Sequence, residues 1–331
     1  MRLSDWKLVA AVAATTLLSV PQVAIADANS SSEWKPGEAI SASQSEKMIA
    51  EFVNGIADRH NIQINPADYE VVSQKGEVSI RAKKKSGVSA AYRSGGPVPE
   101  VAPTVGGDGA RSEASVLGFN VAPPSSAEVS KSRDRVSLGI QAEPNWFPVE
   151  CFRRVVWVDP DPDGVVGDTV VGWQDACTQL GWLPPTAGRG NWIFRMWQTC
   201  ATQQNRQIFT LTACAVQNLI TSPDPRWVDW SPRSELPVGQ CKTIAYGVTV
   251  GPITGQWSYP ACDTIKIDKW NPQVYLKAWW AGRAWGKTRG SELVFSFTAP
   301  EGAGVSGDPR IVMSWAPCRG TGLGDRCNDT Q

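Results

Sequence analysis

The chain has 331 residues, with 32 Lys and Arg side chains against 32 Asp and Glu, so its formal net charge is zero. This balance provides no basic field, which excludes nucleic acid and an anionic membrane surface as expected partners. His60 is the only histidine. Its position excludes a Cys/His zinc site of ordinary spacing and disfavours a Ser-His-Asp or Cys-His catalytic arrangement.

Residues 1–26 have the pattern of a secretory signal peptide. Arg2 and Lys7 precede an apolar stretch from Leu8 to Val20, and Ala24-Ile25-Ala26 provides a small-residue cleavage site. The stretch is too short to span a bilayer and stop there, which disfavours the alternative of an anchor helix. We therefore expect an exported protein, secreted or held in the cell envelope, with no membrane span in the mature chain.

Residues 27–85 are expected to form a small α+β segment. Apolar residues recur at helical spacing over Ser43–Asn61, and a capping box opens this helix at Ser43. Two short strands, Tyr69–Ser73 and Glu77–Ala82, follow the helix. The segment is barely large enough for a core of its own, so it is a pro-region, a docking element or an appendage packed on the rest of the chain.

Residues 86–137 are rich in Gly, Pro, Ala and Ser. Gly95-Gly96-Pro97 and Ala122-Pro123-Pro124 are typical of this range, and its sparse apolar residues have no period. Such a composition predicts a flexible linker that lets the parts on either side move independently.

Residues 138–331 are expected to form the main folded domain. Short runs rich in Val, Ile, Thr and aromatic residues alternate with turn residues, which predicts a mainly β fold, an antiparallel β-sandwich or a barrel-like domain. Gln174–Leu180 and Ala213–Ile220 could instead be helical, which leaves α+β as the alternative. The expected strands are Arg154–Val158, Thr169–Trp173, Trp192–Trp197, Gln207–Ala213, Thr243–Val250, Asp263–Ile267, Val274–Trp280, Leu293–Phe297 and Ile311–Trp315.

All eight cysteines lie in this domain, and an even number in an exported chain favours four disulfides. Spacing alone leaves the connectivity open. Pairing between neighbours along the chain is the most economical arrangement, and it gives Cys151–Cys177, Cys200–Cys214, Cys241–Cys262 and Cys318–Cys327.

Asp159, Asp161 and Asp163 alternate with prolines and precede Gly164. Alternate carboxylates before a glycine resemble the opening of a calcium loop, and Asp168 could supply a further oxygen. The pattern lacks the glutamate of an EF-hand at position 12, and an ordinary acidic turn explains it as well. We expect no cofactor other than a structural calcium ion at these four aspartates.

The domain also holds 14 of the 16 tryptophans. Trp157, Trp192 and Trp315 lie on expected strands and are predicted core residues. Tryptophans in loops or in the Trp279-Trp280 pair can expose ring faces that stack on sugars or protein surfaces, with arginines beside them. The candidate ligand-binding residues are Trp227, Trp230, Trp280, Trp285, Arg226 and Arg283.

Three functions remain open. The first is a secreted non-catalytic binding module that engages a polysaccharide or a protein surface through loop aromatics. The second is a secreted hydrolase that uses two carboxylates, with the N-terminal segment as a pro-region. The third is an interaction protein of the cell surface, such as an adhesin, an inhibitor or a toxin. The sequence selects no catalytic residue, and His60 is expected to be exposed at the end of the first helix.

Overall fold

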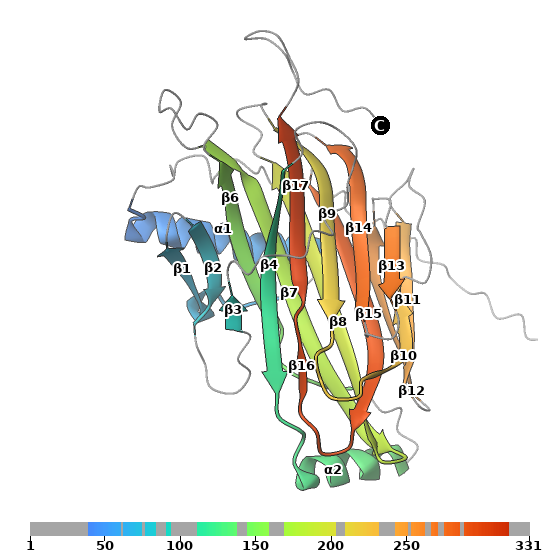
Figure 1. The fold of residues 1–331 in the computed structure, drawn as a ribbon. Coiled ribbons are helices and arrows are strands. Elements are labelled where there is room, and N and C mark those ends of the chain that lie inside the picture. Colours follow the sequence, from blue (N-terminus) through green and yellow to red (C-terminus); the bar gives the residue numbers. More distant parts are fainter. Residues whose placement is uncertain are drawn as a thin grey trace, which may run out of the picture.

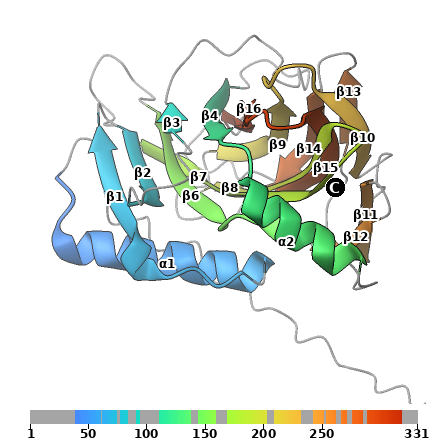
Figure 2. The same cartoon turned by 90° about the horizontal axis from the view of Figure 1, so that it is seen from below.

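Antiparallel strands make up most of the chain that the structure describes, which confirms the predicted mainly β class. Two large sheets share a hydrophobic core, α1 (Ala42–His60) lies across the outer face of the first sheet, and α2 (Ser126–Ser137) lies at one end of the molecule (Figures 1 and 2). The computed structural model describes residues 39–60, 62–74, 77–83, 91–93, 111–137, 144–158, 169–202, 209–231, 242–250, 253–261, 266–270, 275–284 and 288–317.

The first sheet joins the N-terminal segment to the main domain. Its strands in spatial order are β1 (Tyr69–Gln74), β2 (Glu77–Ala82), β6 (Glu150–Val158), β7 (Thr169–Thr186), β8 (Arg189–Thr202), β15 (Arg289–Pro300) and β10 (Arg226–Ser231), and β5 (Asn145–Trp146) pairs with β7. A short helix, η2 (Pro66–Asp68), precedes β1.

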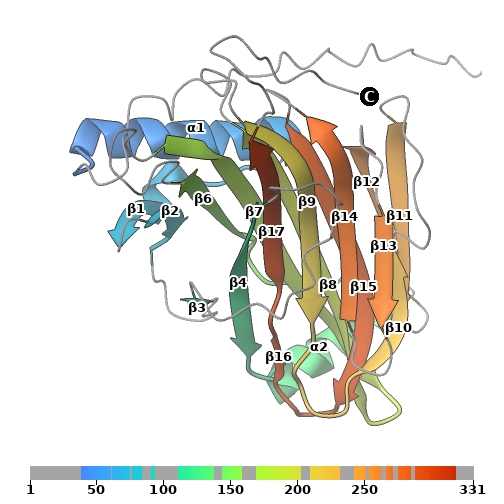
Figure 3. The same cartoon turned by 45° about the horizontal axis from the view of Figure 1, so that its top comes forward.

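The second sheet contains strands from the middle and the end of the chain. Its order is β13 (Lys266–Trp270), β14 (Tyr275–Ala284), β9 (Phe209–Leu219), β17 (Arg310–Pro317), β4 (Arg111–Val121) and β16 (Val305–Gly307), and β3 (Ala91–Arg93) pairs with β4. β11 (Lys242–Val250) and β12 (Ile253–Ala261) form a separate ribbon on the side of β10 and β13 (Figure 3).

The segments with an open helical alternative are strands. Gln174–Leu180 lies within β7, and most of Ala213–Ile220 lies within β9. Alternation explains the outcome for β7: Asp175 and Cys177 face α1, whereas Ala176 and Leu180 face the second sheet. In a helix, these residues would not divide between two opposite faces in this way.

The core between the sheets is built from large side chains of the first sheet and smaller ones of the second. Phe194 and Phe295 of adjacent strands contact each other at a tilt, with ring centroids 5.3 Å apart, and Val216, Leu276 and Ile311 of the second sheet belong to the same cluster. Burying each of these side chains contributes about 2 kcal/mol. Trp192 and Trp315 are each 2% exposed, as predicted for core tryptophans, whereas the Trp157 side chain lies outside the described part.

The N-terminal segment is packed on the main domain. Phe52 and Ile56 of α1 lie in one cluster with Ile80 of β2 and Val155 of β6, and β2 pairs directly with β6. The predicted helix is confirmed, but its capping box is Ser41 with Gln44: Ser41 Oγ accepts from the Gln44 amide, and Gln44 Oε1 accepts from the Ser41 amide.

The structure places a strand and a helix in the C-terminal part of the predicted flexible linker over residues 86–137. Residues 111–121 are β4, which pairs with β17 in the second sheet, and residues 126–137 are α2. Pairing with β17 on one edge and with β16 and β3 on the other stabilises β4 within the sheet. Among the described residues, no helix is both long and apolar enough to cross a membrane.

Two of the predicted disulfides are present. Cys151 and Cys177 are directly opposite each other on β6 and β7, whereas Cys200 and Cys214 connect β8 of the first sheet to β9 of the second. Cys241, Cys262, Cys318 and Cys327 lie outside the described residues, as do residues 1–26 and the predicted calcium loop at Asp159, Asp161, Asp163 and Asp168.

Candidate ligand-binding groove

Trp227 and Trp230 lie on β10 and not in a loop. Their rings are 5.8 Å apart in an edge-to-face arrangement, and both pack against the core between the sheets. A β-bulge brings the two rings together on one side of β10. It places Trp227 opposite Phe297 and Trp230 opposite Phe295. Val228, the additional residue, is 40% exposed. The expected surface of loop tryptophans is therefore not formed by this pair.

The other candidate ligand residues are dispersed. Trp280 is 6% exposed and packs near the Cys200–Cys214 disulfide, with the Arg289 guanidinium 5.3 Å from its ring centroid. Arg226 is exposed and forms an ion pair with Asp224. Trp285 and the Arg283 side chain lie outside the described part of the chain.

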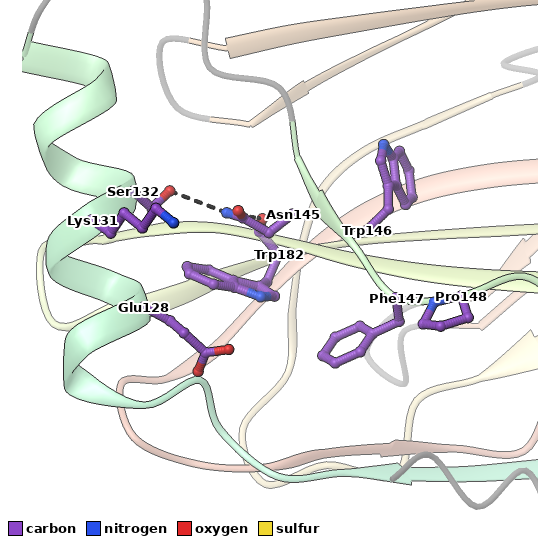
Figure 4. A pocket seen from close by; sticks show the side chains of 8 residues that line it. All are labelled: Glu128, Lys131, Ser132, Asn145, Trp146, Phe147, Pro148 and Trp182. Carbon is purple, nitrogen blue, oxygen red and sulfur yellow. Dashed lines mark hydrogen bonds between the residues drawn. The ribbon is translucent and has the colours of Figure 1, made fainter. Parts of the chain in front are cut away.

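A groove that the sequence did not indicate runs along α2. It has a volume of about 310 Å³, and three elements form it: α2, the segment around β5, and β7 (Figure 4). Its lining residues are Glu128, Lys131, Ser132, Asn145, Trp146, Phe147, Pro148 and Trp182. We call it the α2 groove.

Backbone pairing fixes the aromatic residues of the α2 groove. Asn145 is opposite Trp182 in the β5–β7 ladder, and the Phe147 amide donates to the Leu180 carbonyl at 2.9 Å. The Trp182 indole lies between the α2 side chains and the Phe147 ring (Figure 4). The Trp146 ring lies across Gly181, where a Cβ would come within 2.7 Å of it.

Polar groups from α2 and β5 form the opposite wall. Asn145 Nδ2 donates to Ser132 Oγ at 3.1 Å, and this bond ties α2 to the sheet. Glu128 Oε2 accepts from both the amide and the hydroxyl of Ser125, and these two bonds lower the pKa of its carboxyl. Lys131 is exposed at the rim.

A second groove, of about 330 Å³, lies on the other side of α2 and shares Trp182 with the first. Val129 and Arg133 of α2 line it, and Trp192 contributes to its floor. Arg133 forms an ion pair with Glu301 at 3.3 Å, which bridges α2 to the turn after β15. α2 therefore separates two grooves, and Trp182 lines both of them.

Outside the α2 groove, Asp175 and Glu292 are buried and Glu150 is half-buried, and each has a distinct environment. Asp175 accepts from Arg153 and Arg59, and Glu292 accepts from Arg195 at 2.9 Å. Burial raises the pKa of Glu292 despite this ion pair, and burial raises the pKa of Glu150 to about 7. No cluster of three or more His, Cys, Asp or Glu side chains among the described residues could hold a metal ion.

The local sequence contained one clear signal for this site. Ser125 and Glu128 have the spacing of a capping box, and the structure forms both of its reciprocal hydrogen bonds at the start of α2. That signal predicts a helix but not which strands it meets. Trp182 and Phe147 come together only through the pairing of β5 with β7.

In comparisons with known proteins, the chain matches no family model and no curated protein sequence.

Proposed function

We propose that the protein is an exported, non-catalytic binding module that holds a neutral oligosaccharide in the α2 groove. The observation that carries this proposal is the half-buried Phe147 ring, which lies beside the buried Trp182 indole and opposite a wall of amide, hydroxyl and ammonium groups. Sugar rings present apolar faces that stack on aromatic rings, and equatorial hydroxyls that exchange hydrogen bonds with such polar groups.

Charge supports a neutral ligand over an acidic one. Glu128 and Lys131 contribute opposite charges to the same groove, and Arg133 on the far flank of α2 is already paired with Glu301. A carboxylated or sulfated sugar would need an unbalanced cation at the site.

The groove favours binding over hydrolysis. Glycoside hydrolysis needs two carboxyl groups on either side of the bond, whereas Glu128 is the one carboxylate among the eight lining residues. Glu128 also accepts hydrogen bonds from Ser125 as part of the helix cap, and its lowered pKa makes it a poor proton donor.

Two further features agree with a rigid exported scaffold. Cys151–Cys177 and Cys200–Cys214 are disulfides of the kind that persist in oxidising compartments. In this proposal the two sheets form a sandwich, and the Cys200–Cys214 bond holds its layers together, so that Trp182 keeps its position when a ligand binds.

The proposal is tested by titrating the mature protein with a panel of soluble neutral oligosaccharides while tryptophan fluorescence is recorded. We expect a saturable change, and about a fivefold to tenfold weaker affinity after Lys131→Ala or Phe147→Leu, because one hydrogen bond or one stacked ring contributes about 1 kcal/mol. Lys47→Ala, at an exposed lysine on α1, is the matched control.

Three outcomes reject the proposal. The first is a fluorescence signal that no oligosaccharide changes. The second is a change that Lys131→Ala, Phe147→Leu and Lys47→Ala affect equally. The third is turnover of an oligosaccharide that disappears when a single carboxylate is neutralised, which would replace binding by hydrolysis.

A further inference from the structure

The single histidine is half-buried against the first sheet, whereas it was expected to be exposed at the end of the first helix. His60 ends α1, and its ring centroid lies 6.0 Å from that of Trp197 on β8. His60 Nε2 is buried and has no hydrogen-bond partner in the structure. A buried imidazole nitrogen without a partner has no group ready to stabilise an added proton.

Arginines face this ring from two elements. Arg59 precedes it on α1, and Arg195 approaches from β8, where its guanidinium lies 4.5 Å from the Trp197 ring centroid. Arg195 is paired with Glu292 of β15 at 2.9 Å. The carboxylate of Glu292 on β15 therefore already has an arginine partner.

The anion of β7 is engaged as well. Asp175 is completely buried and accepts two hydrogen bonds from Arg153 of β6, at 2.6 and 2.8 Å, together with one from Arg59. The Arg59 and Arg153 guanidinium carbons each lie 4.7 Å from the Trp173 ring centroid. Asp58 of α1 is the remaining acidic group that acts on Arg59.

We infer that His60 is an acid-sensitive latch that keeps the C-terminal part of α1 on the first sheet while the imidazole is neutral. A proton on His60 adds a positive charge between Arg59 and Arg195, where both nearby carboxylates already have arginine partners. Movement of the end of α1 into water solvates this added charge. The rest of α1 stays on the sheet, because Ile56 and the residues before it make apolar contacts there.

The pH range follows from the direction of the shifts. Burial, Arg59 and Arg195 hold the pKa of His60 well below 6.5, so the closed state binds its proton less readily than an open one. The closed state is therefore fully favoured above about pH 6.5 and loses stability as the pH falls below it. Each unit by which the closed state lowers the pKa of His60 raises the equilibrium constant for opening about tenfold, at a pH where His60 is protonated in the open state.

Glu292 does not drive the opening. Burial raises the pKa of its carboxyl in the closed state, and a raised pKa favours the closed state as the pH falls. His60, with its lowered pKa, is therefore the group that makes the end of α1 sensitive to acid.

The latch is tested by hydrogen exchange of the full chain at about pH 7.5 and about pH 5, corrected for the intrinsic pH dependence of exchange. We expect exchange of the amides at residues 57–60 to rise at least about tenfold at the lower pH, with β7 and β8 unchanged. His60→Gln cannot take up a proton and should lose this response, whereas Glu46→Gln at an exposed position near the start of α1 should keep it.

The inference is overturned if α1 exchanges equally slowly at both pH values, or if His60→Gln responds as the natural protein does. Should His60→Gln fold poorly, His60→Asn provides a second neutral amide for the same comparison. The outcome is independent of oligosaccharide binding, because the α2 groove does not include α1 or the residues beneath it.

Discussion

The Arg59 side chain folds back over Gly55, one turn earlier in α1, and a Cβ on Gly55 would lie 2.5 Å from Arg59 Nη2. From this position Arg59 reaches Asp175 on β7. The absence of a side chain at Gly55 thus permits the ion pair that fixes the end of α1 to the sheet.

Gly55→Ala should leave the stability of the natural protein nearly unchanged. Alanine favours a helix over glycine by about 1 kcal/mol, but its methyl group displaces the Arg59 guanidinium from Asp175. In an Arg59→Ala background nothing is displaced, so Gly55→Ala should there add about 1 kcal/mol to the free energy of unfolding. Urea denaturation of the four proteins measures this coupling.

Asn54→Ala, at the exposed neighbouring position, is the control for Gly55→Ala, because it should have the same effect in both backgrounds. Equal stabilisation by Gly55→Ala with and without Arg59 would show that the close approach has no energetic consequence.

Asp175→Asn should be strongly destabilising. The substitution leaves Arg153, which is 7% exposed, and the half-buried Arg59 without their anion, and breaking a buried ion pair on one side costs about 3–5 kcal/mol. Asp224→Asn is a matched control, because Asp224 also accepts from two arginines but is exposed, and it should cost less than about 1 kcal/mol. Similar urea midpoints for the two variants would contradict the role assigned to Asp175.

Glu150 should make stability fall as the pH rises. Burial raises its pKa to about 7, so between about pH 4.5 and pH 7 the folded state binds the proton more tightly than the unfolded state. Stability from this group is complete below that range and lost above it. Glu150→Gln should therefore be more stable than the natural protein at pH 8, by about 1–2 kcal/mol after allowing for partial exposure of the carboxyl.

Thermal or urea unfolding at pH 8 and at pH 4 measures this difference for Glu150→Gln. The advantage should vanish at pH 4, where the glutamate is protonated in both states. An advantage of the same size at both pH values would indicate a packing effect and not a titration.

Local sequence patterns predicted the mainly β class, α1 and the two described disulfides, because each depends on periodicity or on a short separation along the chain. Patterns of this range could not predict that β4 belongs to the second sheet, since its pairing with β17 joins residues about 200 positions apart. The bulge at Val228 is similar: one additional residue turns Trp227 and Trp230 to the same side, and composition does not reveal it.

The candidate site was harder to predict than the fold, because it too depends on pairing between strands and not on a local pattern. Trp182 was one of many tryptophans, and it becomes part of a groove only because β5 pairs with β7 and α2 packs over both. A histidine at the C-terminus of a helix is favoured by the helix dipole, which predicts a surface position for His60. Its half-buried position follows from the pairing of β2 with β6, which fixes α1 on the sheet.

Peptide mapping under non-reducing conditions tests the remaining cysteines. Neighbour pairing holds for Cys151–Cys177 and Cys200–Cys214, so the same rule predicts Cys241–Cys262 and Cys318–Cys327. We expect four linked peptide pairs and no free thiol. Recovery of a peptide that links Cys241 or Cys262 to Cys318 or Cys327 would contradict the rule.

The Cys200–Cys214 disulfide should contribute more to stability than loop closure alone predicts. The two described disulfides close 14 and 26 residues, and loops of this size contribute about 3 kcal/mol each when cross-linked. Both disulfides are buried, so removal of either leaves a cavity. Cys200–Cys214 also joins β8 of the first sheet to β9 of the second, whereas Cys151–Cys177 joins two strands that already pair with each other. We expect the Cys200→Ala/Cys214→Ala protein to unfold at a lower urea concentration than the Cys151→Ala/Cys177→Ala protein, although its loop is shorter. The reverse order would mean that the bond under α1, and not the bond between the sheets, limits unfolding.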